Sequence, residues 1–226
     1  LDVLTDVDGL VIVNPDNPSG SFIKHEDMKE IIKHAKKLDK WLIVDESFVD
    51  FAPSELKYTL IDNDIIKQNP KLIVIKSISK SYGVPGLRLG VLASSNEKVL
   101  KTMKNNLPVW NINSFAEYFL QILPLYNKDY ICACEKIAEE RNHFYKELLK
   151  IKNLKVFESY SNYFLCEVID GNADKLANNL LKKYNILIKV LTDKKGFEEG
   201  QYIRIAIKDK ADNDYILNCL RDDIWK

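Results

Sequence analysis

The stretch from Ser77 to Gly90 is the part of this chain best suited to chemistry, because it sets one lysine and one arginine among hydroxyls and glycines. It reads Ser-Ile-Ser-Lys-Ser-Tyr-Gly-Val-Pro-Gly-Leu-Arg-Leu-Gly, with the lysine at Lys80 and the arginine at Arg88. Small residues leave backbone and hydroxyl donors free to approach an anion. The stretch therefore predicts a site for an anionic group.

Two other polar clusters precede this stretch in the chain. In the first, Asn14-Pro15-Asp16-Asn17-Pro18-Ser19-Gly20, two prolines would hold Asn17 in a fixed turn. In the second, Asp45-Glu46-Ser47-Phe48, two acids directly follow an apolar run. An ordinary turn between a strand and a helix also explains the first cluster, and a helix N-cap also explains the second.

Each polar cluster follows a short apolar run that predicts a strand. The runs cover residues 10–13, 41–44 and 72–75, and their continuous hydrophobicity is typical of parallel strands covered on both faces. Residues 25–38 carry apolar side chains at helical spacing, which completes a βαβ unit. Because open α/β sheets bind ligands beyond the carboxyl ends of their strands, we expect the three clusters at one edge of the sheet.

The pattern changes after Lys150, where a smaller α+β unit is predicted. We therefore predict an α/β fold with two domains: a large domain over residues 1–125, with a mostly parallel sheet, and a connecting helix plus small C-terminal domain over residues 126–226. The remaining predicted helices cover residues 113–123, 130–149, 173–183 and 212–220, and the remaining strands cover residues 87–93, 154–157, 163–168, 186–189 and 202–207.

Composition excludes several classes of partner. Lys plus Arg and Asp plus Glu each number 33, so the net charge is zero and no field favours nucleic acid or an anionic membrane. No apolar run reaches the length of a membrane span, and the first residues do not resemble a signal peptide, which predicts a cytoplasmic protein. The four cysteines lack zinc spacing, so no metal is expected. The expected partners are small molecules or another copy of the chain.

The three clusters together resemble motifs of the fold-type I pyridoxal-phosphate enzymes, the aspartate aminotransferase superfamily. They are similar to N-P-x-N-P-S/T-G, D-E-x-Y/F and S-x-S-K-x-x-G-x-x-G-x-R-x-G, and they occur in the family's order. The nearest branch contains histidinol-phosphate aminotransferases and threonine-phosphate decarboxylases. The resemblance implies the fold of that family and pyridoxal 5'-phosphate as cofactor.

The resemblance gives Lys80 and Asp45 the central roles. Lys80 matches the lysine that forms a Schiff base with the cofactor and then moves protons as general base and acid. Asp45 matches the carboxylate that pairs with the pyridinium nitrogen and keeps it protonated. A solvated surface lysine is the plain alternative for Lys80.

The resemblance also implies residues that hold the rest of the cofactor and the substrate. Asn17 would bond the 3-oxygen of the ring, Ser77 and Arg88 would bind the phosphate, and Ser79 would lie near it. Phe48 departs from the family, because many aminotransferases have there a tyrosine that also bonds the 3-oxygen. Two residues are predicted to bind substrate: Arg204, through a carboxylate, and Asn162. The plain alternative for Arg204 is a surface position on an edge strand.

The function implied is that of an aminotransferase, which moves an amino group between an amino acid or phosphorylated amine and a 2-oxo acid. Phe48 keeps a second reading open, a decarboxylase of an amino-acid phosphate. A third is a non-catalytic dimerisation fragment. The glycines from Gly83 to Gly90 do not indicate a nucleotide-binding loop, because a strand rather than a helix is predicted after them.

The resemblance further implies a homodimer with residues of both subunits at each cofactor. The chain opens only about ten residues before the first strand that aligns. We therefore expect the N-terminal part of the large domain to be missing, and a chain of this extent to bind the cofactor weakly.

Overall fold

A computed structural model describes residues 2–53, 59–222 and 225. The described chain divides into two compact units. The first unit contains Leu1–Asp16 and Phe22–Cys134, and the second contains Asn17–Ser21 and Glu135–Lys226. The division falls inside the long helix α6 (Asn127–Leu148), whereas the predicted boundary at residue 125 lies before this helix. Each unit is described by itself below.

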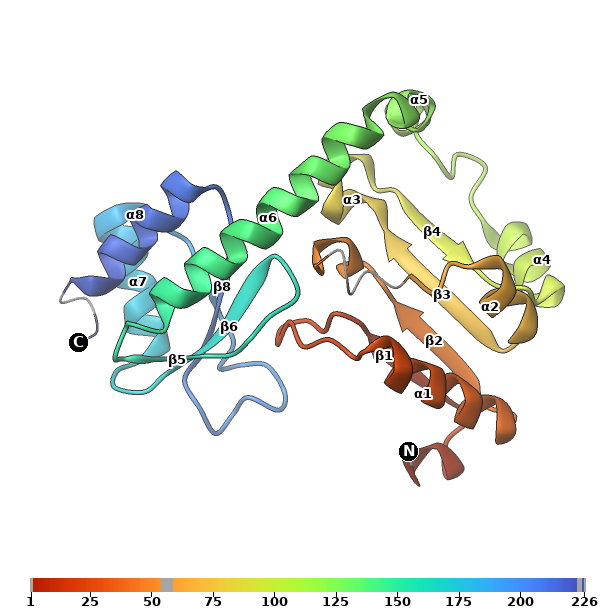
Figure 1. Ribbon diagram of the computed structural model, residues 1–226, viewed down its shortest axis with the longest axis horizontal. Coiled ribbons are helices and arrows are strands. Elements are labelled where there is room, and N and C mark those ends of the chain that lie inside the picture. Colours follow the sequence, from red (N-terminus) through yellow and green to blue (C-terminus); the bar gives the residue numbers. More distant parts are fainter. Residues whose placement is uncertain (1, 54–58, 223–224, 226) are drawn as a thin grey trace. The chain divides into compact units, whose positions relative to one another are not determined.

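The first unit is built on a four-stranded sheet in the order β1-β2-β3-β4 (Figure 1). Strands β1 (Gly9–Val13), β2 (Trp41–Asp45) and β3 (Leu72–Ser77) run parallel, and β4 (Gly90–Ala93) pairs with β3 in the antiparallel direction. The mostly parallel sheet predicted from the apolar runs is therefore present. Its three parallel strands end at the same edge, where the polar clusters of β2 and β3 begin.

One face of this sheet carries the core of the first unit. Helix α1 (His25–Lys37) buries Met28, Ile32 and Ala35 against alternate side chains of β2 and β3, such as Val44 and Val74. The other face is less covered: Val11 of β1 is 64% exposed. The expectation that the strands are covered on both faces is therefore wrong for β1 among the described residues.

Short helices connect the rest of the first unit. One predicted boundary is wrong: the strand expected from Leu87 begins only at Gly90, because Arg88 has a left-handed backbone (φ 56°) that interrupts extended structure. The helices are η1 (Asp2–Thr5), η2 (Val49–Phe51), α2 (Asn63–Gln68), α3 (Ile78–Ser81), η4 (Pro85–Leu87), α4 (Glu97–Asn106), α5 (Ser114–Ile122) and η5 (Leu123–Tyr126).

The second unit is an antiparallel sheet in the order β5-β6-β8-β7 with helices packed on it (Figure 1). Its buried core includes Phe144 of α6, Phe164 of β6 and Ile203 of β8. Strand β7 forms at residues 189–190 rather than at the predicted 186–189. Its elements are β5 (Leu154–Val156), β6 (Tyr163–Val168), α7 (Ala173–Tyr184), β7 (Lys189–Val190), β8 (Tyr202–Ala206) and α8 (Lys210–Arg221). Within the described ranges, no helix combines the length and hydrophobicity needed to cross a membrane.

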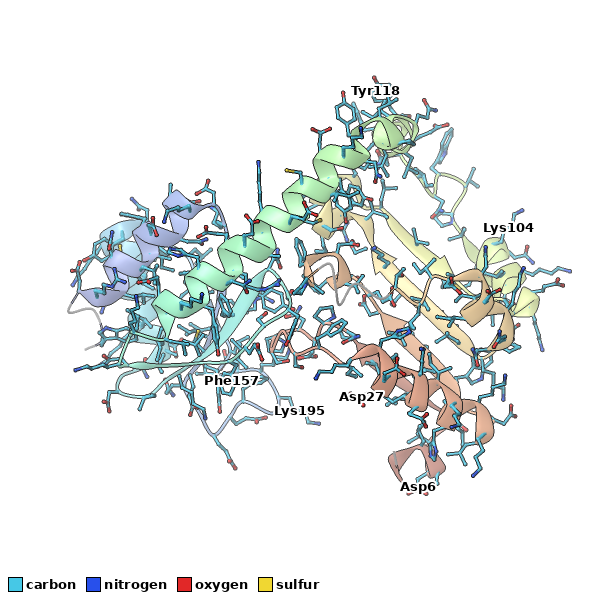
Figure 2. All side chains as sticks on the ribbon, in the orientation of Figure 1. Asp6, Asp27, Lys104, Tyr118, Phe157 and Lys195 are labelled. Atoms are coloured by element: carbon cyan, nitrogen blue, oxygen red, sulfur yellow. The ribbon has the colours of Figure 1, made fainter. Side chains whose placement is uncertain are left out.

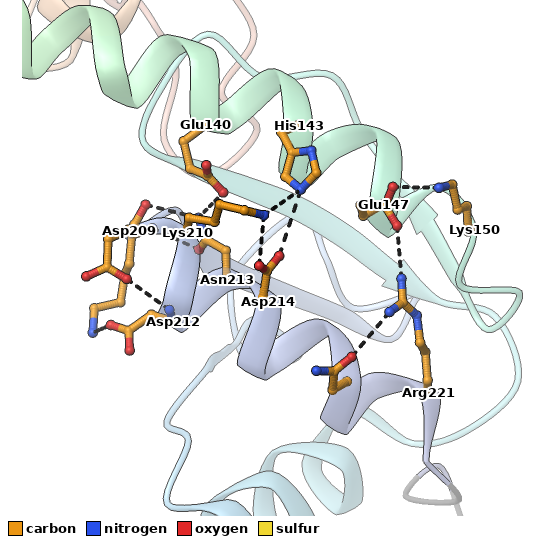
Figure 3. A network of polar contacts seen from close by, with 12 residues as sticks. Glu140, His143, Glu147, Lys150, Asp209, Lys210, Asp212, Asn213, Asp214 and Arg221 are labelled. Atoms are coloured by element: carbon orange, nitrogen blue, oxygen red, sulfur yellow. Dashed lines mark hydrogen bonds and ion pairs between the residues drawn. The ribbon is translucent and has the colours of Figure 1, made fainter.

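Helix α8 is fastened to α6 through Asn213, which is 1% exposed (Figure 3). Its Nδ2 donates to Glu140 Oε1 (3.1 Å) and to the carbonyl of Lys208 (3.0 Å), and its Oδ1 accepts from the amide of Lys208 (3.0 Å). Around it, Lys210 pairs with Asp214 at 2.8 Å. A single buried amide thus closes the start of α8 and joins it to α6.

We expect Asn213→Ala to lower the free energy of unfolding by about 2–3 kcal/mol, because it leaves buried partners unsatisfied. Urea denaturation followed by circular dichroism measures this. Asn218→Ala is the matched control, since Asn218 is exposed on the same helix, and it should change stability by less than about 0.5 kcal/mol. Equal effects of the two substitutions would contradict the role of Asn213.

Candidate functional site

Asp45 lies at the end of β2 with one carboxylate oxygen fixed by its neighbours. Its Oδ1 accepts from the amide of Ser47 (2.8 Å) and from Ser47 Oγ (2.5 Å), and Ser47 Oγ accepts from the amide of Ser77 (3.0 Å). Asp45 Oδ2 has no hydrogen-bond donor within the described part of the chain. The next helix, η2, has Phe48 at its N-cap position, so the N-cap explanation of Asp45 is wrong.

Lys80 lies in α3, the single turn that follows β3 directly. The preceding residue, Ser79, is buried, and its Oγ both donates to the carbonyl of Leu89 (3.3 Å) and accepts from its amide (3.2 Å). Lys80 itself is exposed, and its Nζ lies 6.0 Å from the centre of the Phe48 ring. The turn therefore presents the Lys80 amine outward. The Ser79 hydroxyl is committed to Leu89, and its place near a phosphate stays a prediction.

Ser77 and Arg88 line one open cavity of about 640 Å³ in the first unit. Ser47, Lys76 and Lys104 also line it. Arg88 is exposed, and its Nη1 donates to the carbonyl of Pro85 at 3.1 Å. The two residues predicted to bind a phosphate thus share a cavity with hydroxyl and cationic groups, which are the donors that an anion requires.

The second unit holds Asn17 together with Arg204. Arg204 Nη1 donates to Asn17 Oδ1 at 2.7 Å, and Lys194 Nζ donates to the Asn17 carbonyl at 3.3 Å. The Arg204 guanidinium lies 4.8 Å from the centre of the Tyr163 ring. Strand β8 lies between β6 and β7, so the edge-strand explanation of Arg204 is wrong. Asn162, half-buried just before β6, accepts from the amide of Ile207 through its carbonyl (2.8 Å).

The turn that carries Asn17 is held against the loop before β6. The amide of Tyr160 donates to the carbonyl of Gly20 at 2.8 Å. Gly20 has φ 73°, and a Cβ there would meet Ser159 Oγ at 2.0 Å. Only glycine fits this close approach without displacing Ser159. Close packing against Ser159 therefore explains why the first motif ends in glycine.

The structure brings the predicted residues together as two sets. One set belongs to the first unit and one to the second, and their roles toward cofactor and substrate stay predictions. The first set is Asp45, Phe48, Ser77, Ser79, Lys80 and Arg88, and the second is Asn17, Asn162 and Arg204.

Lys189 is a candidate that the sequence analysis missed. In the β7–β8 ladder it is paired directly with Arg204, and paired residues of antiparallel strands project from the same face. Two like charges in this arrangement repel one another unless an anion lies between them. Lys189 is recognised only through the register in which β7 and β8 pair, and no single stretch of the sequence contains that information.

Glu46 is buried beside the site and has a structural role. Its Oε2 accepts from Thr59 Oγ1 (2.6 Å) and its Oε1 from the amide of Leu60 (2.6 Å). Burial raises the pKa of Glu46 above its usual value, although these hydrogen bonds and the nearby Lys76 lower it. The second acid of the Asp-Glu motif therefore holds Thr59 and Leu60 in place.

We expect Glu46→Gln to gain stability relative to the unsubstituted protein as the pH rises. A carboxyl whose folded pKa is raised stabilises the fold below its unfolded pKa, and that contribution is lost as pH rises through the folded pKa. Glutamine cannot ionise and escapes this loss. Melting temperatures at about pH 5 and pH 8 measure the difference. The control is Glu26→Gln, at an exposed position of α1, and a difference for Glu46→Gln that does not change with pH would oppose this account.

Comparison with known proteins places these features in a family context. The family model described as aminotransferase class I and II matches residues 2–220. L-serine phosphate decarboxylase of Campylobacter jejuni is 34% identical over 219 residues, which cover 95% of this chain and 55% of that protein. Histidinol-phosphate aminotransferase of Clostridium novyi is 32% identical over 214 residues, covering 94% of this chain and 55% of the relative. The chain thus spans about half the length of these curated relatives.

A solved structure shows the same architecture. The structure of a decarboxylase from Sulfurospirillum multivorans superposes with a TM-score of 0.87 at 30% sequence identity. The match covers 98% of this chain and 62% of that one. The similarity therefore includes both units of the described fold.

Proposed function

Because this chain belongs to the class I and II aminotransferase family of pyridoxal-phosphate enzymes, we propose that its protein decarboxylates a phosphorylated amino acid such as L-serine phosphate or threonine phosphate. The family, the fold and the pyridoxal-phosphate cofactor predicted from the sequence are confirmed. The activity is refined: the matches to L-serine phosphate decarboxylases and threonine-phosphate decarboxylases favour the alternative reading over the aminotransferase reading.

The residues present fit the cofactor. Asp45 offers a fixed carboxylate with Oδ2 unengaged by described residues, which suits a protonated ring nitrogen. The cavity lined by Ser77 and Arg88 suits a phosphate, and Lys80 offers an exposed amine for covalent attachment. Asn17 would bond the ring oxygen. When bound, pyridoxal phosphate supplies an electron sink for the electron pair released at the substrate carbon.

The observation that carries the choice of substrate is the pairing of Arg204 with Lys189. A phosphorylated amino acid has two anionic groups, a carboxylate and a phosphate. Lys194, which contacts the carbonyl of Asn17, adds a third cation in the same unit. This concentration of positive charge supports a substrate with more negative charge than a simple amino acid.

Decarboxylation requires two contributions from residues of this chain: a proton donor and a negative charge beside the ring nitrogen. The bond between the α-carbon and the carboxylate breaks, carbon dioxide leaves, and a proton must return to the same carbon. The Lys80 amine would deliver that proton, and the Asp45 charge would stabilise the positive ring nitrogen throughout. Phe48, with its ring below the Lys80 amine, adds no hydroxyl to this site.

Product analysis tests the proposal against the second candidate, an aminotransferase, which the 32% identity to a histidinol-phosphate aminotransferase favours. The protein that contains this chain is incubated with L-serine phosphate or threonine phosphate, and carbon dioxide and the phosphorylated amine are measured. Parallel reactions contain histidinol phosphate and 2-oxoglutarate, and glutamate is measured. We expect carbon dioxide in amounts equal to the amine. Glutamate without carbon dioxide would establish the aminotransferase.

We expect Lys189→Gln to raise the KM for L-serine phosphate about tenfold, because a charge-assisted contact is lost. The KM for unphosphorylated L-serine, tested at high concentration, should change less than about twofold if Lys189 binds the phosphate. Lys183→Gln, at an exposed position near the end of α7, is the control. Equal losses for both substrates would assign Lys189 to the carboxylate instead.

We also propose a homodimer, as the family resemblance implies. Several strongly exposed apolar side chains occur in the segment between α4 and α6, and exposed apolar side chains in such number are typical of an interface. They include Val109, Trp110, Phe115, Leu125 and Tyr118, which points outward in Figure 2. Sedimentation velocity of the protein at several concentrations tests this, and a monomer at all of them would be the contrary result. A cytoplasmic location stays a prediction.

A further inference from the structure

A partly buried polar cluster in the first unit joins Lys76, which lines the cavity of Ser77 and Arg88, to residues that the chemistry above does not use. Lys76 Nζ pairs with Asp50 Oδ1 at 2.7 Å, and both side chains are only 16% exposed. The other oxygen of this carboxylate, Asp50 Oδ2, is also buried, as are Ser81 Oγ and Tyr130 Oη. None of these three atoms has a hydrogen-bond partner at ideal geometry among the described residues.

The three atoms belong to one polar group. Burial raises the pKa of the Tyr130 phenol above its usual value; the Asp50 carboxylate raises it further, and the Ser81 hydroxyl lowers it. Both side chains therefore act on the phenol at short range. The carboxylate can only accept hydrogen bonds and the two hydroxyls can donate, so small rotations would satisfy all three.

Aromatic packing also holds the Tyr130 side chain, in addition to the polar group. The Tyr82 ring stacks on the Tyr130 ring with centroids 3.8 Å apart and an interplanar angle of 6°. Phe119 of α5 meets the Tyr82 ring edge-on, at 6.2 Å. The first turns of α6 therefore lie against the end of α3 (Figure 1).

Lys80 lies between two serines, Ser79 and Ser81, whose contacts anchor the turn in different ways. Ser79 fastens one side of the turn to Leu89 with hydrogen bonds that are both made. On the other side, the Ser81 hydroxyl is buried and acts on the Tyr130 phenol at short range. The orientation of the exposed Lys80 side chain therefore depends on the contacts of both neighbouring serines.

We propose that Tyr130 and Asp50, acting through Ser81, are positioning residues for Lys80. This inference rests on the proposed function only in taking the Lys80 amine as the reactive group. The anchor itself belongs to the folded chain and does not depend on which reaction follows.

Tyr130→Phe tests the anchor, because it removes the phenol oxygen and keeps the ring that stacks on Tyr82. The amides of Tyr82 and Gly83, which donate to the carbonyls of Ile78 and Lys80 at 3.3 Å, report on the turn. We expect hydrogen exchange at these two amides to quicken about fivefold, with exchange in β1–β3 unchanged. Ser81→Ala should give the same change, and the double variant should add little to it.

The control is Tyr215→Phe, which removes the same atom from a side chain of α8 that is 49% exposed and lies in the second unit. In the active protein we expect Tyr130→Phe to lower kcat about tenfold while KM changes less than about twofold. Unchanged exchange at both amides, or faster exchange throughout the sheet, would overturn the anchor. Faster exchange with unchanged kcat would overturn the positioning role. If the unsubstituted protein lacks the proposed activity, the exchange data still decide whether the anchor exists.

Discussion

Replacement of Lys80 by alanine is expected to lower kcat/KM for decarboxylation by about 10⁴-fold or more, because the chain loses both its attachment point and its proton donor. The fold should be unaffected. Lys80 is exposed in a turn that is held by hydrogen bonds of Ser79 and of backbone amides, so its removal leaves no buried group unpaired. The free energy of unfolding should therefore change by less than about 0.5 kcal/mol.

Two measurements check this result in the protein that contains the chain. Carbon dioxide release gives the loss of activity, and borohydride treatment followed by peptide mass spectrometry identifies the lysine that carries the cofactor. Lys101→Ala, at an exposed position of α4 outside the lining of the cavity of Ser77 and Arg88, is the matched control and should retain activity. Labelling of another lysine, or full activity without Lys80, would remove Lys80 from the site.

Asp45→Asn is expected to lower kcat by about 10²–10³-fold, because a neutral amide cannot stabilise a protonated ring nitrogen. The structure makes this substitution a clean test of charge. An asparagine Oδ1 can still accept from the amide and the hydroxyl of Ser47, so the link from β2 to the amide of Ser77 is kept. Stability should consequently stay close to that of the unsubstituted protein.

The measurement is kcat together with the melting temperature, in the presence and absence of added cofactor. Asp39→Asn, at a strongly exposed position after α1, is the control and should leave kcat unchanged. Asp45→Glu retains the charge but lengthens the side chain, so it should recover part of the lost activity. If Asp45→Asn retained full activity while Lys80→Ala did not, Asp45 would be a structural residue only.

Much of the fold could be predicted from the sequence because its strands are continuous apolar runs. The runs at residues 41–44 and 72–75 correspond to β2 and β3, and the helix predicted from residue 25 begins at His25. Coverage of a parallel strand on both faces favours such runs, and a local pattern is enough to detect them. The motif residues of β2 and β3 then follow at the strand ends.

Strand β7 shows where local pattern fails. Ile186, Leu187 and Ile188 form a short apolar run, which suggests a strand, and Ile188 is buried in the core of the second unit. The ladder to β8 nevertheless includes only Lys189 and Val190. An apolar run of this kind indicates an extended backbone, whereas a strand also requires a partner strand at hydrogen-bonding distance.

The parts of the site that could not be predicted depend on distant residues. The opposition of Lys189 and Arg204 follows from a register between two strands. The contact of Tyr130 with Tyr82 joins the start of a long helix to a short turn far earlier in the chain. Neither relation has a local signature, because both partners are common residue types at ordinary spacings.

The membership of residues 17–21 in the C-terminal unit has a consequence for how the protein is made. During synthesis the turn with Asn17 leaves the ribosome well before Arg204, its hydrogen-bond partner, which lies 187 residues further on. Closing so long a loop is slow, and its entropy must be overcome before the contact forms. The first motif to be translated is thus one of the last to reach its final conformation, and a nascent chain stalled before β8 would carry Asn17 without the arginine that holds it.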